Sequence, residues 1–480
     1  MSDKKNKPPI NYDIPDFRFP EYEIQKIDND INLYVISDKT QLLSGISVLF
    51  PRGAYHENIN GLAYFTSQLL RRGTKNRTPT EIAQEIDSMG AMLNTSAHWD
   101  FTSIGLICLN EFVEKGMEIL ADCIFNPVFP EEEISGFKKK HIADIEQELA
   151  DPSYLAGIAL NNAMFSGHPY GHPLLGDPQS IETISRDNCI NWHKSMLIAG
   201  QSRLVQSRLG RQPTEKIHIV ASGNIDSDYI STLITKFFKP TEGFGVQEAK
   251  TQKPIPETRN KDGTFEIPDS ENKKKSKRNR IIITEKKEIN QTILRIGKFT
   301  ENRDNPDFPA LQFINTIFGG FFLSRLNEIL REKLGYTYGV HSYINARQFS
   351  STQIISTSIN KETTSDAVRR IIEQMELMSK TKISESEYFL VRQYLLGSFV
   401  RGLETARQIA SLVTNLLISK LSGNYYDNFY KKVKEISIED LYDCQMKYYK
   451  PEGLVISAVG NSDFLKKELM DFGETELSGF

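Results

Sequence analysis

The sequence has few cysteines and no long apolar run, and both shortages narrow the class of protein. Its four cysteines lie far apart and include no C-x-x-C pair. Neither a disulfide framework nor a zinc knuckle is therefore expected. The longest apolar stretches, such as 454–459, have the length of a strand, so no transmembrane helix is predicted. No apolar core follows the basic N-terminal residues, which predicts no signal peptide, no membrane partner and a cytoplasmic protein.

Charge of one sign is not in excess either. The 58 basic and 62 acidic side chains leave a net charge of −4. This balance excludes a generally basic surface, so no nucleic-acid partner is expected. Only the run 273–280 is strongly basic, and it ends a polar segment rich in Lys, Glu and Pro. Because no aromatic residue is interleaved, we interpret the run as part of a solvated linker and not as a nucleic-acid or targeting patch.

The length of 480 residues predicts two large domains. On either side of the linker the chain opens with two strand-like runs and a helix. It closes with an apolar strand, a Gly-Asn pair and a helix, and the pairs stand at 223–224 and 460–461. The repeated order predicts an α+β fold of two pseudo-symmetric domains, each a mixed, mostly antiparallel sheet packed by helices. The expected division is an N-terminal arm at 1–20, a first domain at 21–240, a linker at 241–280 and a second domain at 281–480.

Helix starts are visible in both domains. Pro130 followed by three glutamates predicts a helix beginning there, because Pro suits the first turn and acids suit the N-terminal dipole. Ser384 with Glu387 has the spacing of a capping box.

Catalytic signatures are also scarce. The sequence contains no G-x-S-x-G, Walker or G-x-G-x-x-G motif. Of its eight histidines, only His168 and His172 have the spacing of metal ligands. The intervening Pro and Gly break the helix that such ligation needs, so we expect a tight structural turn. His141 and Asp144 lie one helical turn apart, with no further ligand evident.

Residues 61–78 read GLAYFTSQLLRRGTKNRT on the first predicted helix. This segment resembles the metal-binding helix of the pitrilysin/insulinase-like zinc metallopeptidases, the inverzincins, whose signature is H-x-x-E-H. In that signature two His at i and i+4 ligate zinc, and the Glu acts on the zinc-bound water. The corresponding positions here are Tyr64, Ser67 and Gln68, and the resemblance places the third ligand position at Asp144. A phenol, a hydroxyl and an amide do not make a zinc site, so we expect no metal in this chain.

The resemblance extends from about residue 21 to residue 472. The segments 89–102, 168–185 and 318–343 resemble the family in the same order. The segment 197–214 departs from it, because this chain has a longer basic stretch there, and its packing is left open.

The segment LREKLGYTYGV carries the positive functional signal. In family members that complete a partner's active site, an Arg near a helix end and a Tyr seven residues later face the substrate backbone. The resemblance places this pair at Arg331 and Tyr338. The local pattern predicts Arg331 in the last helical turn, Gly335 as its stop and a strand over 336–340. Such a strand would put Tyr336 and Tyr338 on one face, which leaves open which of them faces substrate.

The resemblance thus implies a non-catalytic subunit of a heterodimeric zinc metalloendopeptidase, inactive alone. A homologous partner would supply H-x-x-E-H and the zinc, and this chain would present Arg331 and Tyr338 to a peptide substrate. The alternative is a structural or assembly protein of the same fold, in a homodimer or another complex, with no role in peptide cleavage. Arg331 would then be a cation favoured by the dipole at the helix C-terminus, and the Tyr would be a half-buried strand residue.

Overall fold

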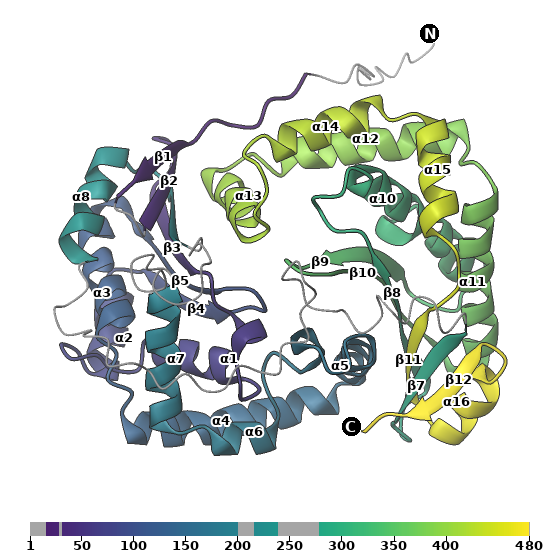
Figure 1. The fold of residues 1–480 in the computed structure, drawn as a ribbon, viewed down its shortest axis with the longest axis horizontal. Coiled ribbons are helices and arrows are strands. Elements are labelled where there is room, and N and C mark those ends of the chain that lie inside the picture. The colour runs from purple at the N-terminus through teal and green to yellow at the C-terminus, as the bar shows by residue number, and fades with distance from the viewer. Residues whose placement is uncertain (1–15, 28–30, 200–215, 239–277, 480) are drawn as a thin grey trace, which may run out of the picture.

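The computed structural model describes residues 16–27, 31–199, 216–238 and 278–479. Most of the predicted linker at 241–280 and of the segment 197–214 lies outside these residues. In the described chain each half is built on one sheet with helices around it (Figure 1).

The strands of the first half are β1 (Glu23–Lys26), β2 (Ile31–Ser37), β3 (Leu43–Phe50), β4 (Met92–Ala97), β5 (Thr102–Leu109) and β6 (Ile217–Gly223). Those of the second half are β7 (Asn279–Glu285), β8 (Gln291–Thr300), β9 (Val340–Ala346), β10 (Ser351–Asn360), β11 (Val455–Gly460) and β12 (Gly473–Leu477). β7 begins two residues before the predicted start of the second domain, and the domain boundaries stay a prediction.

The two sheets have the same strand order over five positions. The described strands run β1-β2-β6-β3-β5-β4 in the first sheet and β12-β7-β11-β8-β10-β9 in the second. β2 pairs with β6, and β7 with β11, in parallel, and the next three pairings in each sheet are antiparallel. Only the outer strand differs, because β1 is antiparallel to β2 and β12 is parallel to β7. The shared order confirms the α+β fold with two pseudo-symmetric halves.

The helices of the first half are α1 (Leu62–Leu69), α2 (Pro79–Ser88), α3 (Val113–Phe125), α4 (Glu131–Ala150), α5 (Pro152–Met164), α6 (Pro178–Thr183), α7 (Arg186–Ala199) and α8 (Ser227–Phe237). Those of the second half are α10 (Phe308–Asn315), the π-helical segments η4 (Thr316–Gly320) and η5 (Asn327–Lys333), α11 (Thr364–Lys380), α12 (Glu385–Arg401), α13 (Ala406–Ile418), α14 (Tyr425–Glu435), α15 (Ile438–Tyr448) and α16 (Ser462–Leu469). Pro130 directly precedes α4, and Ser384 and Glu387 form the expected capping box of α12. No helix among the described residues has the length and apolar character needed to cross a bilayer.

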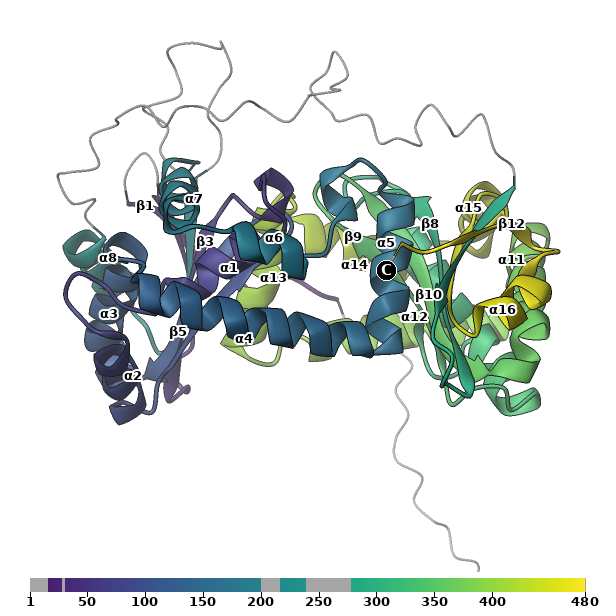
Figure 2. The same ribbon diagram turned by 90° about the horizontal axis from the view of Figure 1, so that it is seen from below.

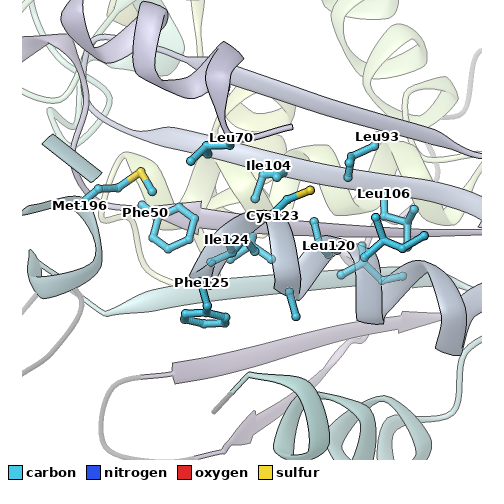
Figure 3. Packing of buried hydrophobic residues seen from close by; sticks show 14 of the residues in the cluster. Phe50, Leu70, Leu93, Ile104, Leu106, Leu120, Cys123, Ile124, Phe125 and Met196 are labelled. Atoms are coloured by element: carbon cyan, nitrogen blue, oxygen red, sulfur yellow. The ribbon is translucent and has the colours of Figure 1, made fainter. Parts of the chain in front are cut away.

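Each sheet has its main core on one face. In the first half, helices such as α1 and α3 bury that face, and Figure 3 shows Phe50, Ile104 and Cys123 among aliphatic side chains there. The four cysteines are free, buried thiols, and burial raises the pKa of the Cys123 thiol to about 12. A thiol this protonated at neutral pH is a packing group and not a nucleophile.

The other face of each sheet is covered by a helix from the opposite half. α5 follows the long α4 out of the first half and packs on β7, β8 and β11 (Figure 2). In return, α13 packs on β2 and β6, where Val413 is buried with Tyr34 and Val220. The exchange is reciprocal, so neither half buries both faces of its sheet by itself.

The chain before β1 also joins the two halves. Phe19 stacks on Tyr426 of α14 with 5.2 Å between ring centroids, and Phe17 lies 4.7 Å from the ring of Tyr430. The backbone N–H of Phe19 donates to Asp427 at 2.6 Å. The described end of the predicted N-terminal arm is therefore packed on the second half.

The exchange of α5 can be tested at a glycine of β8. A Cβ atom at Gly297 would stand 2.6 Å from the sulfur of Met164 and 3.2 Å from Leu160 Cδ1, both on α5. We expect Gly297→Ala to lower the free energy of unfolding by roughly 1–3 kcal/mol, because the added methyl group pushes α5 off the sheet. Urea unfolding followed by circular dichroism measures the change.

Gly136→Ala is the matched control, since nothing lies within 4 Å of a Cβ atom there. In the middle of α4 this substitution should be neutral or stabilise by about 0.5–1 kcal/mol. Equal stability of the two variants would argue against tight packing of α5 on β8.

Candidate functional site

The helix that resembles the zinc helix is fixed at its N-terminus. Both carboxyl oxygens of Glu57 accept backbone N–H groups, from Gly61 at 2.7 Å and from Ala63 at 2.8 Å. The side chain of Glu57 is fully buried, and burial raises its pKa to about 8. Gly61 has φ of +86°, and a side chain there would meet the carbonyl of Leu175. These contacts set the direction in which α1 presents its side chains.

Tyr64 occupies the first ligand position and is packed against a histidine. Its ring stacks on that of His141, with centroids 5.0 Å apart and planes inclined by 27°. The Nε2 atom of His141 donates to the carbonyl of Leu175 at 2.9 Å, and burial lowers the pKa of this histidine. Burial and then the nearby charge of Asp144 raise the pKa of Tyr64. The structure thus brings Tyr64 and Asp144 into electrostatic range, and the Tyr64 phenol stays neutral at pH 7.

The other two positions are bound to backbone. Gln68 Nε2 donates to the carbonyl of Thr95 on the edge strand β4 at 3.0 Å. Ser67 is buried, and its hydroxyl donates to the carbonyl of Tyr64 at 2.7 Å. Asp144 is exposed on α4. Within the described ranges, no group of three or more His, Cys, Asp or Glu side chains could hold a metal ion. A phenol, an amide engaged as a donor and one carboxylate do not fit zinc.

The pair of histidines with metal-like spacing forms a structural turn, as the sequence predicted. A 3₁₀ turn at Pro169–Gly171 separates them, and His168 Nδ1 accepts the backbone N–H of Tyr170 at 3.1 Å. A Cβ atom at Gly171 would collide with the carbonyl of Phe165. The Nδ1 atom of His172 lies instead 3.5 Å from a carboxyl oxygen of Glu57, in the segment before α1.

Arg331 lies in η5, near the end of the helix that follows η4. Its guanidinium carbon lies 3.7 Å from the ring centroid of Phe322, and Nη2 donates to the Phe322 carbonyl at 3.2 Å. Nε donates to the neighbouring Glu332 at 2.9 Å. Gly335 has φ of +64°, and its N–H donates to the carbonyl of Arg331 at 3.2 Å. The helix therefore stops at Gly335, as predicted, and its last turn holds Arg331 against Phe322.

The predicted strand over 336–340 is wrong, because β9 begins only at Val340. The side chain of Thr337 competes with strand pairing: its hydroxyl donates to the carbonyl of Gly339 at 2.9 Å and accepts the N–H of the same residue at 3.1 Å. The two tyrosines consequently do not share a face. The Tyr336 hydroxyl donates to Asp366 at 3.0 Å, whereas Tyr338 is 96% exposed. Tyr338 is thus the one with a ring in solvent.

A buried asparagine fixes this loop to the helix that carries Arg331. Asn327 donates to the carbonyl of Val340 at 2.9 Å and accepts the Val340 N–H at 3.1 Å. It also donates to the carbonyl of Phe321 at 3.2 Å. Asn327 therefore joins the segment before η5 to the start of β9. No motif in the sequence marks Asn327, and its only sequence signal is the spacing of three residues that puts it on the same helical face as Leu330.

Comparison with known proteins places the chain in a family. The model of the insulinase peptidases, family M16, matches residues 33–178, and the model of the M16 inactive domain matches residues 213–395. An uncharacterized zinc protease of Mycobacterium tuberculosis is 22% identical over 383 residues, which is 80% of each chain. A protein of Helicobacter pylori named non-peptidase homolog YmxG is 23% identical over 441 residues, 90% of this chain and 93% of that one.

The fold has solved counterparts. The crystal structure of a peptidase M16 inactive domain from Pseudomonas fluorescens matches with a TM-score of 0.75 at 20% identity, covering 92% of this chain and 98% of that one. The duplicated sheets and both family models agree: the chain belongs to the insulinase peptidase family, M16, and its second half matches the inactive domain of that family.

Proposed function

We propose that this chain is the non-catalytic subunit of a heterodimeric zinc metalloendopeptidase. The observation that carries the proposal is a contrast between the two halves. On α1, the ligand positions hold neutral side chains bound to their own backbone or packed on rings. In the second half, Arg331 and Tyr338 stand at a helix end and loop that are fixed by Asn327 while the Tyr338 ring is exposed. A homologous partner with an intact H-x-x-E-H motif would hold the zinc.

In this proposal Arg331 and Tyr338 act as hydrogen-bond donors to the backbone of a peptide near the bond that the partner cleaves. The Tyr338 hydroxyl makes no hydrogen bond to any residue in the described ranges, which leaves its donor available to a ligand. Phe322 keeps the Arg331 guanidinium in one orientation before substrate arrives. Fixed donors of this kind position a carbonyl and stabilise the negative charge that develops on it. An extended peptide would pair with a sheet edge of the partner through main-chain hydrogen bonds. Such pairing depends little on the amino-acid sequence of the peptide.

The second candidate function is a structural or assembly role with no part in peptide cleavage. The name of the Helicobacter pylori relative, a non-peptidase homolog, favours it. In that case the stacking of Arg331 on Phe322 is architecture, and Tyr338 contacts a protein neighbour instead of substrate.

Substitution of Arg331 distinguishes the two functions. We expect Arg331→Ala to lower the turnover of the reconstituted pair roughly 10²–10³-fold, as the loss of one oxyanion donor does in other hydrolases. Tyr338→Phe should also lower turnover, because it removes only the hydroxyl. The measurement is cleavage of a short fluorogenic peptide by the purified pair.

Lys333→Ala is the matched control for this assay. Lys333 lies on the same helix, and its exposed ammonium pairs with Glu328 at 2.7 Å. Turnover of this variant should match the unaltered pair. Unchanged turnover for Arg331→Ala on a short peptide would refute the role proposed for Arg331.

The metal content of the isolated chain is a separate prediction. After dialysis against micromolar zinc, we expect no stoichiometric zinc in this chain by plasma mass spectrometry, because Tyr64 and Gln68 offer no anionic or imidazole ligand. In the pair, Asp144→Ala in this chain should leave the zinc content unchanged. One zinc per isolated chain that disappears on Asp144→Ala would contradict the proposal and favour an independent metallopeptidase.

A further inference from the structure

A cavity of about 360 Å³ lies where the two halves meet. It is bounded by α5 on one side and by β8, β9 and β10 on the other, and α5 lies between the two sheets in Figure 1. Its volume is that of a small-ligand pocket. The lining contains two arginines and no acidic residue, and the rest is aromatic, aliphatic or neutral polar.

Arg295 is the first of these cations. It lies on β8 opposite Ser356 of β10, and its Nη1 atom donates to the carbonyl of Leu294 at 3.0 Å. Burial lowers the pKa of Arg295, and the nearby Tyr343 and Asp151 raise it by less. No carboxylate oxygen of the described chain lies within 4.0 Å of its guanidinium. The charge of Arg295 is therefore half-buried and has no ion-pair partner within the described ranges.

Arg347 is the second cation, in the turn that joins β9 to β10. Its guanidinium carbon lies 4.6 Å from the ring centroid of Trp99 and 4.8 Å from that of Tyr170. It donates to Asn161 Oδ1 at 3.1 Å and to the carbonyl of Tyr170 at 3.3 Å, both neutral acceptors. Burial lowers its pKa to about 10, so it remains charged at neutral pH. Arg347 thus joins the two halves and adds a second positive charge to the cavity.

Tyr343 brings a hydrogen-bond donor to the same place. It lies on β9 opposite Ile354 of β10. Arg295 on β8 lies opposite Ser356, which is two residues further along β10. Alternate residues share a face of a sheet, so Tyr343 and Arg295 point to the same side. Both Arg295 and Arg347 lie close enough to lower the pKa of the Tyr343 phenol, although burial raises it more. Tyr343 lines the cavity and is 45% exposed, so the cavity is accessible from solvent at this residue.

We propose that this cavity binds the C-terminal carboxylate of a peptide whose last residue is apolar. Arg295 and Tyr343 would contact the carboxylate, and Arg347 would add positive charge beside them. The aliphatic side of the cavity, which includes Ile158, Leu160 and Ile354, would receive the last side chain. An inorganic anion would leave that apolar side unfilled, which is why the site fits a carboxylate attached to an apolar group. The inference rests on the proposed function, since it assigns the peptide end that the pair would bind.

The test is direct binding of two peptides to the full isolated chain. The probes are a fluorescein-labelled pentapeptide that ends in Phe with a free carboxylate and the same peptide with a C-terminal amide. By fluorescence anisotropy we expect the free acid to bind about 10- to 100-fold more tightly, because hydrogen bonds to a charged group are the stronger ones. Arg295→Gln should remove the preference, and Arg295→Lys should keep part of it.

Arg401→Gln is the control, because Arg401 is exposed at the end of α12. It removes one positive charge outside the cavity and should keep the full preference, and circular dichroism verifies that each variant is folded. Equal binding of acid and amide to the unaltered chain would overturn the proposal, as would a full preference in folded Arg295→Gln. Displacement of the peptide by inorganic phosphate as readily as by 3-phenylpropionate would overturn the assignment to a peptide terminus. The binding assay does not depend on peptide cleavage. The proposed anion site and the proposed role of Arg331 can therefore be refuted independently of each other.

Discussion

The reciprocal packing of α5 and α13 is the contact on which the rest of this structure depends. Each helix leaves its own half and buries the open face of the other sheet, with Leu160 and Met164 against Gly297 on one side and Val413 against Tyr34 on the other. Most of the stabilisation comes from removing apolar surface from water. Because each half completes the other, their relative position is set by a core and not by a linker. A cavity bounded by both halves is then a fixed feature.

The two halves share one topology and differ in the side chains that it carries. In the first, α1 follows two strands and is held by Glu57, and its ligand positions hold a phenol, a hydroxyl and an amide. In the second, η5 carries Arg331, and Asn327 ties the loop with Tyr338 to it.

Sequence reasoning succeeded at helix ends, where local chemistry decides the structure, and failed at one local competition and wherever distant contacts decide it. Pro130, the Ser384 capping box and Gly335 mark helix ends through their own backbone or side-chain preferences, so these were predictable. The strand expected over 336–340 does not form because Thr337 bonds to Gly339, a local competition that alternating hydrophobicity does not register. The hydrophobic periodicity of α5 shows that the helix has an apolar face but not which sheet that face covers. The meeting of Arg295, Tyr343 and Arg347 follows from the pairing of β8 and β9 with β10, and hydrophobic patterns do not show which strands pair.

The central claim is that this chain works with a zinc-holding partner. Affinity purification of the tagged chain from its native cells, with quantitative mass spectrometry of the co-purified proteins, tests it most directly. The account predicts an equimolar homologue of similar size that contains H-x-x-E-H and brings one zinc per pair. A homodimer, or a stable complex whose members lack that motif, would contradict it and leave Arg331 and Tyr338 as parts of an assembly surface.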